Sequence, residues 1–352
     1  MFPFLRLPFL CIQDVTDMWD IDELYHFSLL SKKAKRISKR RKENDLEVYL
    51  NMYFCVLTIR RNGEDVCRMV YKQKKFLFNR EEIPSFDPDF SSFFQLTQHF
   101  LDVFNCCLQQ IDFKLKRRLT ENHLIEIINW LNNSKTEIRG VVIKGATWSM
   151  LELYMNRFRK TIRQLYFNDK KFKNEGGYIC KSVNFGIKDS FLSLHNSPWF
   201  HLDCILNLNC EQISGNKLNF TAEDLNVFLR SWQEGKTNRE AKQVVLSTSS
   251  PRDVKEVLKG CGGELMDPRT NKLKFRILRQ NKYEDIWIRG GIYIRRNDGC
   301  LAVMQTNSYR PYTEDEDVSE EQVEVYLKYR DNWNSENSHD QLNETFFSFY
   351  IF

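Results

Sequence analysis

Hydrophobic residues recur along this chain with two different periods. Segments such as 93–107 place apolar residues three or four positions apart, which predicts amphipathic helices. Short β-type runs follow such segments, namely QIDF (110–113), GVVI (140–143), QLYF (164–167) and QVVL (243–246). Parallel strands with a helix returning on the outside produce this spacing. The pattern predicts an α/β fold in the form of a leucine-rich-repeat-like α/β solenoid; a doubly wound sheet is the alternative, although no glycine-rich phosphate loop follows the first strand.

Two further segments have the pattern of β-hairpins. Residues 56–71 contain an Asn-Gly turn between strand-like arms, and their expected register places Ile59 opposite Val66. Residues 292–305 repeat the pattern around an Asp-Gly turn. Both segments contain the run Ile-Arg-Arg-Asn, so we expect the same hairpin design near the start and near the end of the strand–helix region.

Residues 7–40 predict three short helices. Pro8 suits the start of the first helix, because its missing N–H has no partner to lose there. Asp20 with Glu23 three positions later has the pattern of a capping box, and Ser31 suits the start of the third helix. A unit of this size cannot bury all of its apolar side chains by itself. Part of its surface should therefore contact another surface.

Charge is unevenly distributed, although the formal net charge is only +5. Residues 32–42 carry eight positive charges and no negative one, whereas residues 313–345 hold eleven acids against two bases. The basic run has two interpretations: a solvated helix face, which we favour, or a nucleic-acid or nuclear-import patch. The second interpretation makes a nucleic-acid-binding regulatory protein the alternative function.

Length, cysteine use and the N-terminal residues restrict the class of protein. At 352 residues, roughly two structural units are expected. Arg6 interrupts the apolar start and Asp14 stands where a cleavage site belongs, which argues against a signal peptide. No apolar run is long enough for a membrane span, and the ten cysteines include no pair with CxxC spacing. These features predict a globular protein with free thiols in the cytoplasm and/or the nucleus.

The sequence contains none of the common phosphate-binding, zinc-protease, hydrolase or kinase motifs. His195, His201, Cys204 and Cys210 come nearest to a metal site, but their spacing is irregular for zinc. We therefore expect no catalytic residue, no metal and no cofactor. A binding protein is favoured over an enzyme.

Two segments resemble known families. Residues 7–37 resemble the F-box, a three-helix module that docks onto the Skp adaptor of SCF ubiquitin ligases. They begin with Leu-Pro, and SLLSKKAK at 28–35 matches the F-box order of a small residue, two apolar residues, Ser and Lys. Residues 218–247 resemble the core of the type 2 F-box-associated domain, in which DLNxFLxxWxxG followed by Asn is typical. The whole is similar to the nematode group of F-box proteins, with two departures: Ala34 replaces an aromatic residue, and no Pro follows Asn238.

The resemblance implies a substrate-recognition adaptor of an SCF-type E3 ubiquitin ligase. The F-box would bind the Skp adaptor and through it a cullin, while the C-terminal domain would bind an unidentified protein substrate. Alternatively, the apolar surface of the first helices folds back onto the solenoid as its N-terminal cap. The implied parts are an F-box at 1–45, a β-hairpin and connector at 46–90, an F-box-associated repeat-like α/β domain ending in the second hairpin at 91–312, and an acidic C-terminal tail at 313–352. The expected adaptor-binding residues are Leu7, Pro8, Ile12, Val15, Leu24, Phe27, Leu29, Leu30 and Ser31.

Overall fold

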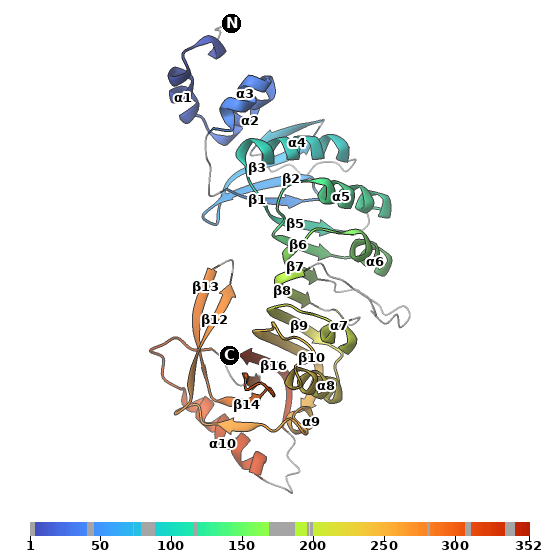
Figure 1. Ribbon diagram of the computed structural model, residues 1–352, viewed down its shortest axis with the longest axis vertical. Helices are drawn as coiled ribbons and strands as arrows, with labels where there is room; N and C mark the ends of the chain where they lie inside the picture. Colours follow the sequence, from blue (N-terminus) through green and yellow to red (C-terminus); the bar gives the residue numbers. More distant parts are fainter. Residues whose placement is uncertain are drawn as a thin grey trace. The chain divides into compact units, whose positions relative to one another are not determined.

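The structure, a computed structural model (Figure 1), describes residues 4–40, 46–72, 74–78, 89–115, 119–168, 187–195, 197, 200–279, 282–306, 311–334 and 342–352. The chain divides into two units. Unit 1 comprises residues 1–166 and 184–186, and unit 2 comprises residues 167–183 and 187–352. The four-part division expected from the sequence stays a prediction.

Unit 1 begins with a 3₁₀ turn and three α-helices, which are η1 (Phe4–Arg6), α1 (Phe9–Asp17), α2 (Ile21–Leu30) and α3 (Lys32–Ser38). The expected caps are present. The Asp20 carboxylate accepts the Glu23 N–H at 2.8 Å, and the Glu23 carboxylate accepts the Asp20 N–H at 3.0 Å. Ser31 Oγ accepts the Ala34 N–H at 3.1 Å. These bonds satisfy backbone donors that the first turn of a helix leaves without a partner, so the helix starts follow from the local sequence.

The strands of unit 1 combine antiparallel and parallel pairs. In chain order they are β1 (Leu46–Asn51), β2 (Val56–Arg61), β3 (Glu64–Lys72), β4 (Lys75–Phe78), β5 (Leu108–Lys114), β6 (Gly140–Lys144) and β7 (Ile162–Asn168). They are hydrogen-bonded in the order β4-β3-β2-β1-β5-β6-β7. The pairs among β1 to β4 are antiparallel, whereas β5 runs parallel to both β1 and β6. The helices that precede β5, β6 and β7 lie on one face of these strands (Figure 1): α4 (Phe90–Phe104), α5 (Glu121–Asn133) and α6 (Trp148–Arg157).

The first predicted hairpin forms, but with a different register. Asn62 and Gly63 have φ values of 55° and 87° at the turn, as an Asn-Gly turn between antiparallel strands requires. A β-bulge interrupts the pairing just before the turn, so Ile59 lies opposite Cys67. Val66 is the extra residue of the bulge, and its side chain is exposed. The prediction of Ile59 opposite Val66 was therefore wrong.

Unit 2 contains mixed strand pairs and a separate two-stranded ribbon. Its helices are α7 (Leu202–Leu206), α8 (Ala222–Gln233), α9 (Val254–Val257) and α10 (Glu320–Asn334). Its strands are β8 (Ile187–His195), β9 (Gln212–Leu218), β10 (Gln243–Asp253), β11 (Glu264–Met266), β12 (Lys272–Arg279), β13 (Lys282–Arg289), β14 (Gly291–Arg295), β15 (Leu301–Thr306) and β16 (Asn343–Ile351). The order is β8-β9-β10-β16-β15-β14-β11, with β8, β9 and β10 parallel and the other neighbours antiparallel. β12 and β13 form the ribbon.

The α/β class expected from the sequence is confirmed. QIDF and GVVI lie in the parallel pair β5–β6, and QVVL lies in β10, parallel to β9. A helix between two strands returns the chain to the same end, which is why helix–strand alternation predicts parallel neighbours. Antiparallel pairs at β1–β4 and at β10–β16 make the arrangement mixed. The leucine-rich-repeat-like solenoid stays a prediction.

Residues 313–352, expected to form an acidic tail, take part in the fold of unit 2. They include α10 and β16, and β16 lies between β10 and β15. Phe347, Phe349 and Tyr350 are buried, whereas the acidic residues of α10 are exposed. The burial of aromatic side chains therefore outweighs the local excess of negative charge.

Burial makes several cysteine thiols weak acids. It raises the pKa of Cys55 and of Cys67 to about 12, and the pKa of Cys210 to about 11. Because the thiolate is the reactive form, we expect iodoacetamide at pH 8 to modify the exposed Cys11 and to leave the three buried thiols intact. Peptide mass spectrometry of the native chain checks this; alkylation of Cys55 as fast as of Cys11 would contradict it.

The same pKa shifts predict a loss of stability at alkaline pH. In the unfolded chain these thiols lose their protons near the ordinary pKa of about 8.5, whereas the folded chain keeps them up to about pH 11 to 12. Above pH 8.5 the unfolded state thus binds fewer protons than the folded state, and the free energy of unfolding falls as the pH rises. Urea unfolding between pH 8 and pH 11 measures this decrease.

Candidate partner-binding surface

The residues singled out from the sequence divide into a buried and an outer group. Ile12, Leu24 and Phe27 are only 2%, 0% and 7% exposed. Leu7 and Val15 are half-buried, and the exposed members are Pro8, Leu29, Leu30 and Ser31. The structure therefore places part of the predicted surface on the outside and part in the core.

The buried group holds the N-terminal helices together. Ile12 and Phe27 belong to one apolar cluster that also includes residues of α3. The Phe27 ring lies edge-on to the rings of Trp19 and Phe4, with centroid distances of 5.0 and 5.6 Å. Leu24 is fully buried beneath the same helices. These contacts show that Ile12, Leu24 and Phe27 help to position the helices; their binding to the adaptor stays a prediction.

A second set of contacts fixes α2 and α3 on the rest of unit 1. The buried Tyr25 ring packs against aromatic side chains of β4 and α4. Ser28 Oγ–H donates to the Tyr25 carbonyl, which leaves Ser28 Oγ to accept the N–H of His99 Nε2 at 2.8 Å. Lys35 Nζ lies 3.4 Å from the Asp102 carboxylate. One face of these helices thus packs on the rest of unit 1, while another face stays outside; the cap alternative for the apolar surface stays a prediction.

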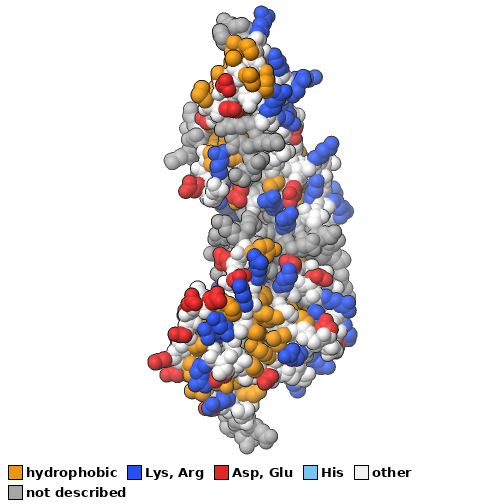
Figure 2. All heavy atoms as spheres, turned by 60° about the vertical axis from the view of Figure 1, so that its left-hand side comes forward, with side chains coloured by type: hydrophobic (Ala, Val, Ile, Leu, Met, Phe, Trp, Pro, Cys, Tyr) orange, Lys and Arg blue, Asp and Glu red, His pale blue; other side chains and the backbone are white. Residues whose placement is uncertain are grey.

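Apolar side chains remain on that outside. Phe9, Leu10, Met18, Leu29 and Leu30 are between 46% and 80% exposed, and we call them the outer apolar residues. The described residues contain only four other large hydrophobic side chains classed as exposed, and those are spread over both units. The upper part of Figure 2 shows hydrophobic side chains at the N-terminal helices with Lys and Arg side chains beside them. Such a concentration makes these residues a candidate interaction surface.

Phe9, Leu10 and Met18 were not among the expected adaptor-binding residues, although Leu10 and Met18 were expected on the apolar face of the first helix. Helix α1 buries Ile12 and Thr16, which lie one turn apart on the same side. Leu10 therefore lies on the opposite side, among polar residues. An apolar side chain on the polar side of an amphipathic helix was the signal that could have found it.

The basic run forms the outer side of α3. Ala34 and Ile37 are buried, while most of the Lys and Arg side chains around them are exposed. The Arg40 guanidinium lies 4.3 Å above the centroid of the Phe9 ring, so cationic and apolar residues adjoin here. This arrangement agrees with the favoured interpretation of the run as a solvated helix face. Residues 41–42 lie outside the described residues.

In unit 2, the residues that carry the resemblance to F-box-associated domains have structural roles. Thr221 and Asp224 form the capping box of α8, with hydrogen bonds of 3.0 and 2.8 Å. Leu225 and Trp232 are buried on the inner side of the helix. Asn226 Nδ2 donates to two backbone carbonyls at the end of α9, at 2.9 and 2.8 Å. The sequence pattern thus stabilises α8 and the loop that packs against it.

Two further amides fasten the segments around α8. Gln233 Nε2 donates to the carbonyls of Cys261 and Arg295 at 2.7 and 3.1 Å. Asn238 Nδ2 donates to the carbonyl of Ile205 in α7 at 3.0 Å, and its backbone has φ 51°, a region that Asn tolerates. This contact does not depend on a following Pro, so the second departure from the family pattern leaves it intact.

The residues nearest to a metal site in the sequence have other contacts. Cys204 and Cys210 are buried, and His195 Nδ1 lies 3.2 Å from Asn216 Nδ2. Within the described ranges, no group of three or more His, Cys, Asp or Glu side chains could hold a metal ion. Nor does any helix among these residues have the length and apolar character to cross a membrane.

Comparison with known proteins gives a match for one segment of the chain. Residues 183–246 match the family model described as F-box associated. No curated protein and no solved structure matches the chain. The matched segment includes β9 and α8 and overlaps the stretch 218–247 that carries the resemblance. The chain therefore contains, at residues 183–246, a segment with the sequence of an F-box-associated domain.

Proposed function

We propose that this protein is a substrate-recognition adaptor of an SCF-type E3 ubiquitin ligase, without enzymatic activity of its own. Its N-terminal helices act as the F-box that docks on the Skp adaptor and, through it, on a cullin. All but residues 184–186 of the part that matches F-box-associated domains belongs to unit 2, and this unit binds the protein substrate. The observation that carries the proposal is the presence of the outer apolar residues on α1 and α2 in a chain with that match.

Docking through the outer apolar residues is physically favourable. Full removal of a Leu or Met side chain from water contributes about 1.5–3 kcal/mol, and a few such anchors usually dominate a binding energy. The cluster around Phe27 and the packing of Tyr25 on α4 already hold these helices in place. Little conformational freedom is therefore lost on docking.

A nucleic-acid-binding regulatory protein is the second candidate, because the exposed side of α3 is densely cationic. The two candidates differ in their response to salt. Binding to phosphates weakens steeply as salt increases, since bound counterions are released. Docking through apolar side chains depends only weakly on salt, because burial of apolar surface drives it.

Calorimetric titration of the purified chain with purified Skp adaptor tests the proposal. Leu10→Ser combined with Leu30→Ser should weaken adaptor binding by about 10- to 1,000-fold, because two exposed anchors are lost. Val66→Ser combined with Val227→Ser is the matched control. It removes two exposed apolar side chains from other surfaces, and its adaptor affinity should equal that of the wild type.

A charge-reversal variant separates the two candidates. Arg36→Glu with Lys39→Glu should leave adaptor binding nearly unchanged, because charges at the rim mainly affect the association rate. The same variant should abolish any binding to nucleic acid. The proposal fails if the wild type does not bind the adaptor, or if the Leu10/Leu30 variant binds it as tightly as the wild type does.

A further inference from the structure

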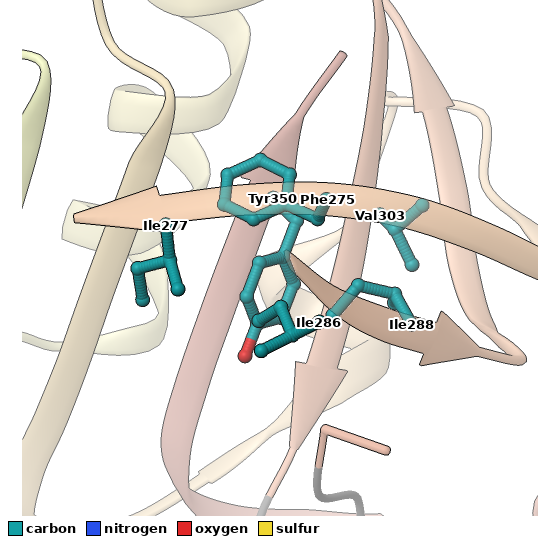
Figure 3. Close-up of a cluster of buried hydrophobic side chains, with 6 residues drawn as sticks. All are labelled: Phe275, Ile277, Ile286, Ile288, Val303 and Tyr350. Carbon is teal, nitrogen blue, oxygen red and sulfur yellow. The ribbon is translucent and has the colours of Figure 1, made fainter. Parts of the chain in front are cut away.

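The ribbon β12–β13 packs on unit 2 by one of its faces. Phe275 and Ile277 of β12 and Ile286 and Ile288 of β13 form a buried cluster with side chains of β15 and β16. Figure 3 shows these side chains around Tyr350, whose ring lies 5.2 Å from that of Phe275. Successive side chains of a strand point to opposite faces, so the burial of this face leaves the alternate positions on the outside.

The outer face of the ribbon carries cations next to aromatic rings. Lys274 pairs with Trp287 across the ribbon. Lys272 Nζ lies 4.3 Å from the centroid of the Trp287 ring, and the Arg276 guanidinium lies 5.3 Å from that of Tyr283. Tyr283 is 61% exposed, which is unusual for a large aromatic side chain. Cations and an exposed ring together suit a binding surface more than a purely solvated strand face.

The cations of this face exceed its carboxylates. Lys274 Nζ lies 2.9 Å and Arg276 Nε 3.9 Å from the same side chain, Asp285. Lys272 interacts with the Trp287 ring and with a backbone carbonyl. Three cations therefore share one carboxylate on the outer face between residues 272 and 287. This charge balance attracts an acidic partner.

The ribbon already contacts an acidic segment of this chain, which pairs with it at Tyr312 and turns at residues 314–315. Trp287 and Tyr312 form an antiparallel bridge, with hydrogen bonds of 2.9 Å in both directions. Lys272 Nζ donates to the Glu314 carbonyl, and Arg289 Nη2 donates to the carbonyl of Glu316 at 2.9 Å. The backbone of the segment is thus bound, while the side chains of its acids point largely to solvent. Cations of the ribbon therefore already contact the backbone of an acidic segment.

We propose that the outer face of the β12–β13 ribbon, formed by Lys272, Lys274, Arg276, Tyr283 and Trp287, binds an extended acidic segment of a protein partner. The inference that this partner is the ubiquitination substrate rests on the proposed function; the binding itself does not. Surplus positive charge on this face supplies affinity, and the exposed Tyr283 ring adds apolar contact. The acidic residues 314–317 lie close enough to compete with the partner for the same cations.

Fluorescence anisotropy with the full-length chain tests this surface. The probe is a fluorescein-labelled ten-residue peptide in which Glu alternates with Thr, and the reference peptide has Gln in place of Glu. We expect binding of the Glu peptide, binding at least about tenfold weaker for the Gln peptide, and a decrease in affinity as salt increases. Tyr283→Ala should weaken binding several-fold without a change in charge.

Charge variants decide whether the ribbon is the site. Lys274→Glu with Arg276→Glu should weaken binding of the Glu peptide by at least about tenfold. The milder Lys274→Gln with Arg276→Gln should also weaken it, and this variant keeps the test valid if the reversal disturbs the ribbon. Arg230→Glu with Lys259→Glu is the control, since it makes the same charge change elsewhere on unit 2 and should have little effect.

Removing negative charge from residues 314 and 315 tests whether these acids compete with the peptide for the cations of the ribbon. Glu314→Gln with Asp315→Asn should raise the affinity for the Glu peptide several-fold, because two neighbouring negative charges are removed. Equal binding of both peptides, no binding of the Glu peptide, or unchanged binding by the Lys274/Arg276 variants would overturn the inference. It would also be overturned if an oligouridine RNA binds more tightly than the peptide through the same cations, because the site would then serve nucleic acid.

The two proposals fail independently. The Lys274/Arg276 variants should bind the Skp adaptor as the wild type does, and the Leu10/Leu30 variant should bind the Glu peptide as the wild type does. Loss of adaptor binding with peptide binding retained would remove the ligase function and leave the acidic-segment site in place.

Discussion

We expect deletion of residues 343–352 to abolish the folding of unit 2. The deleted strand, β16, pairs with β10 on one side and with β15 on the other. It buries Phe347 and Phe349 at 0% and 2% exposure, and the Phe349 ring lies 5.9 Å from that of Phe228 in α8. Each such side chain contributes about 3–5 kcal/mol, and a whole domain is stable by only about 5–15 kcal/mol. Hydrogen exchange should show that β9 and β10 lose their protection.

Point substitutions in the same segment measure how much single side chains contribute to the stability of unit 2. Phe349→Ala should lower the free energy of unfolding by about 3–5 kcal/mol, because it leaves a cavity between the strands and α8. Phe352→Ala is the matched control, since its side chain is 40% exposed, and it should change the free energy of unfolding by about 1 kcal/mol or less. Unaltered protection of β10 in the deletion variant would show that residues 343–352 are a dispensable tail.

Substitution by Ala should affect two leucines of α2 differently: one change should lower stability, and the other should weaken adaptor binding. Leu24 is 0% exposed and Leu30 is 75% exposed. Leu24→Ala should lower the free energy of unfolding by about 2–5 kcal/mol, because it opens a cavity under the N-terminal helices. Leu30→Ala should change it by about 0.5 kcal/mol or less and, if the proposed function holds, weaken adaptor binding by about tenfold or more.

Urea unfolding and adaptor titration of both variants measure the two effects separately. A fall in stability for Leu30→Ala as large as that for Leu24→Ala would show that both leucines are buried in solution. A normal adaptor affinity for Leu30→Ala, with the Leu10/Leu30 double variant affected, would assign the docking mainly to Leu10.

Features that depend on a few neighbouring residues could be predicted from the sequence. The capping pair Asp20–Glu23 and the Asn-Gly turn at Gly63 need only local hydrogen bonds and local backbone angles, and both are present. The register of that hairpin could not be predicted, because the bulge at Val66 has no turn residue that marks it.

The sequence of the β12–β13 ribbon contains a strand pattern from which the ribbon could have been predicted. Residues 272–277 alternate basic and apolar side chains, which is the period of a strand with one buried face. The alternation identifies which side chains go inward, such as Phe275 and Ile277. It does not identify the surface that covers them, because Val303 and Tyr350 come from segments distant in the sequence.

At the candidate site, too, the sequence predicts part of the arrangement and tertiary packing decides the rest. Helical periodicity shows that Leu10 and Ile12 lie on different sides of α1, and that Leu24 and Leu30 do not share one side of α2. Which side is covered depends on α3, on the aromatic residues of β4 and α4, and on Trp19, and their positions result from packing across the whole unit.

The sequence by itself determined the α/β class, the helix starts, the Asn-Gly hairpin turn and the match of residues 183–246 to F-box-associated domains, since each depends on short-range pattern or composition. Only the tertiary structure decided that the acidic C-terminal segment supplies β16 between β10 and β15, and which apolar residues of α1 and α2 stay outside. Strand order and burial result from the sum of many long-range contacts, and the identity of a residue does not specify its distant neighbours.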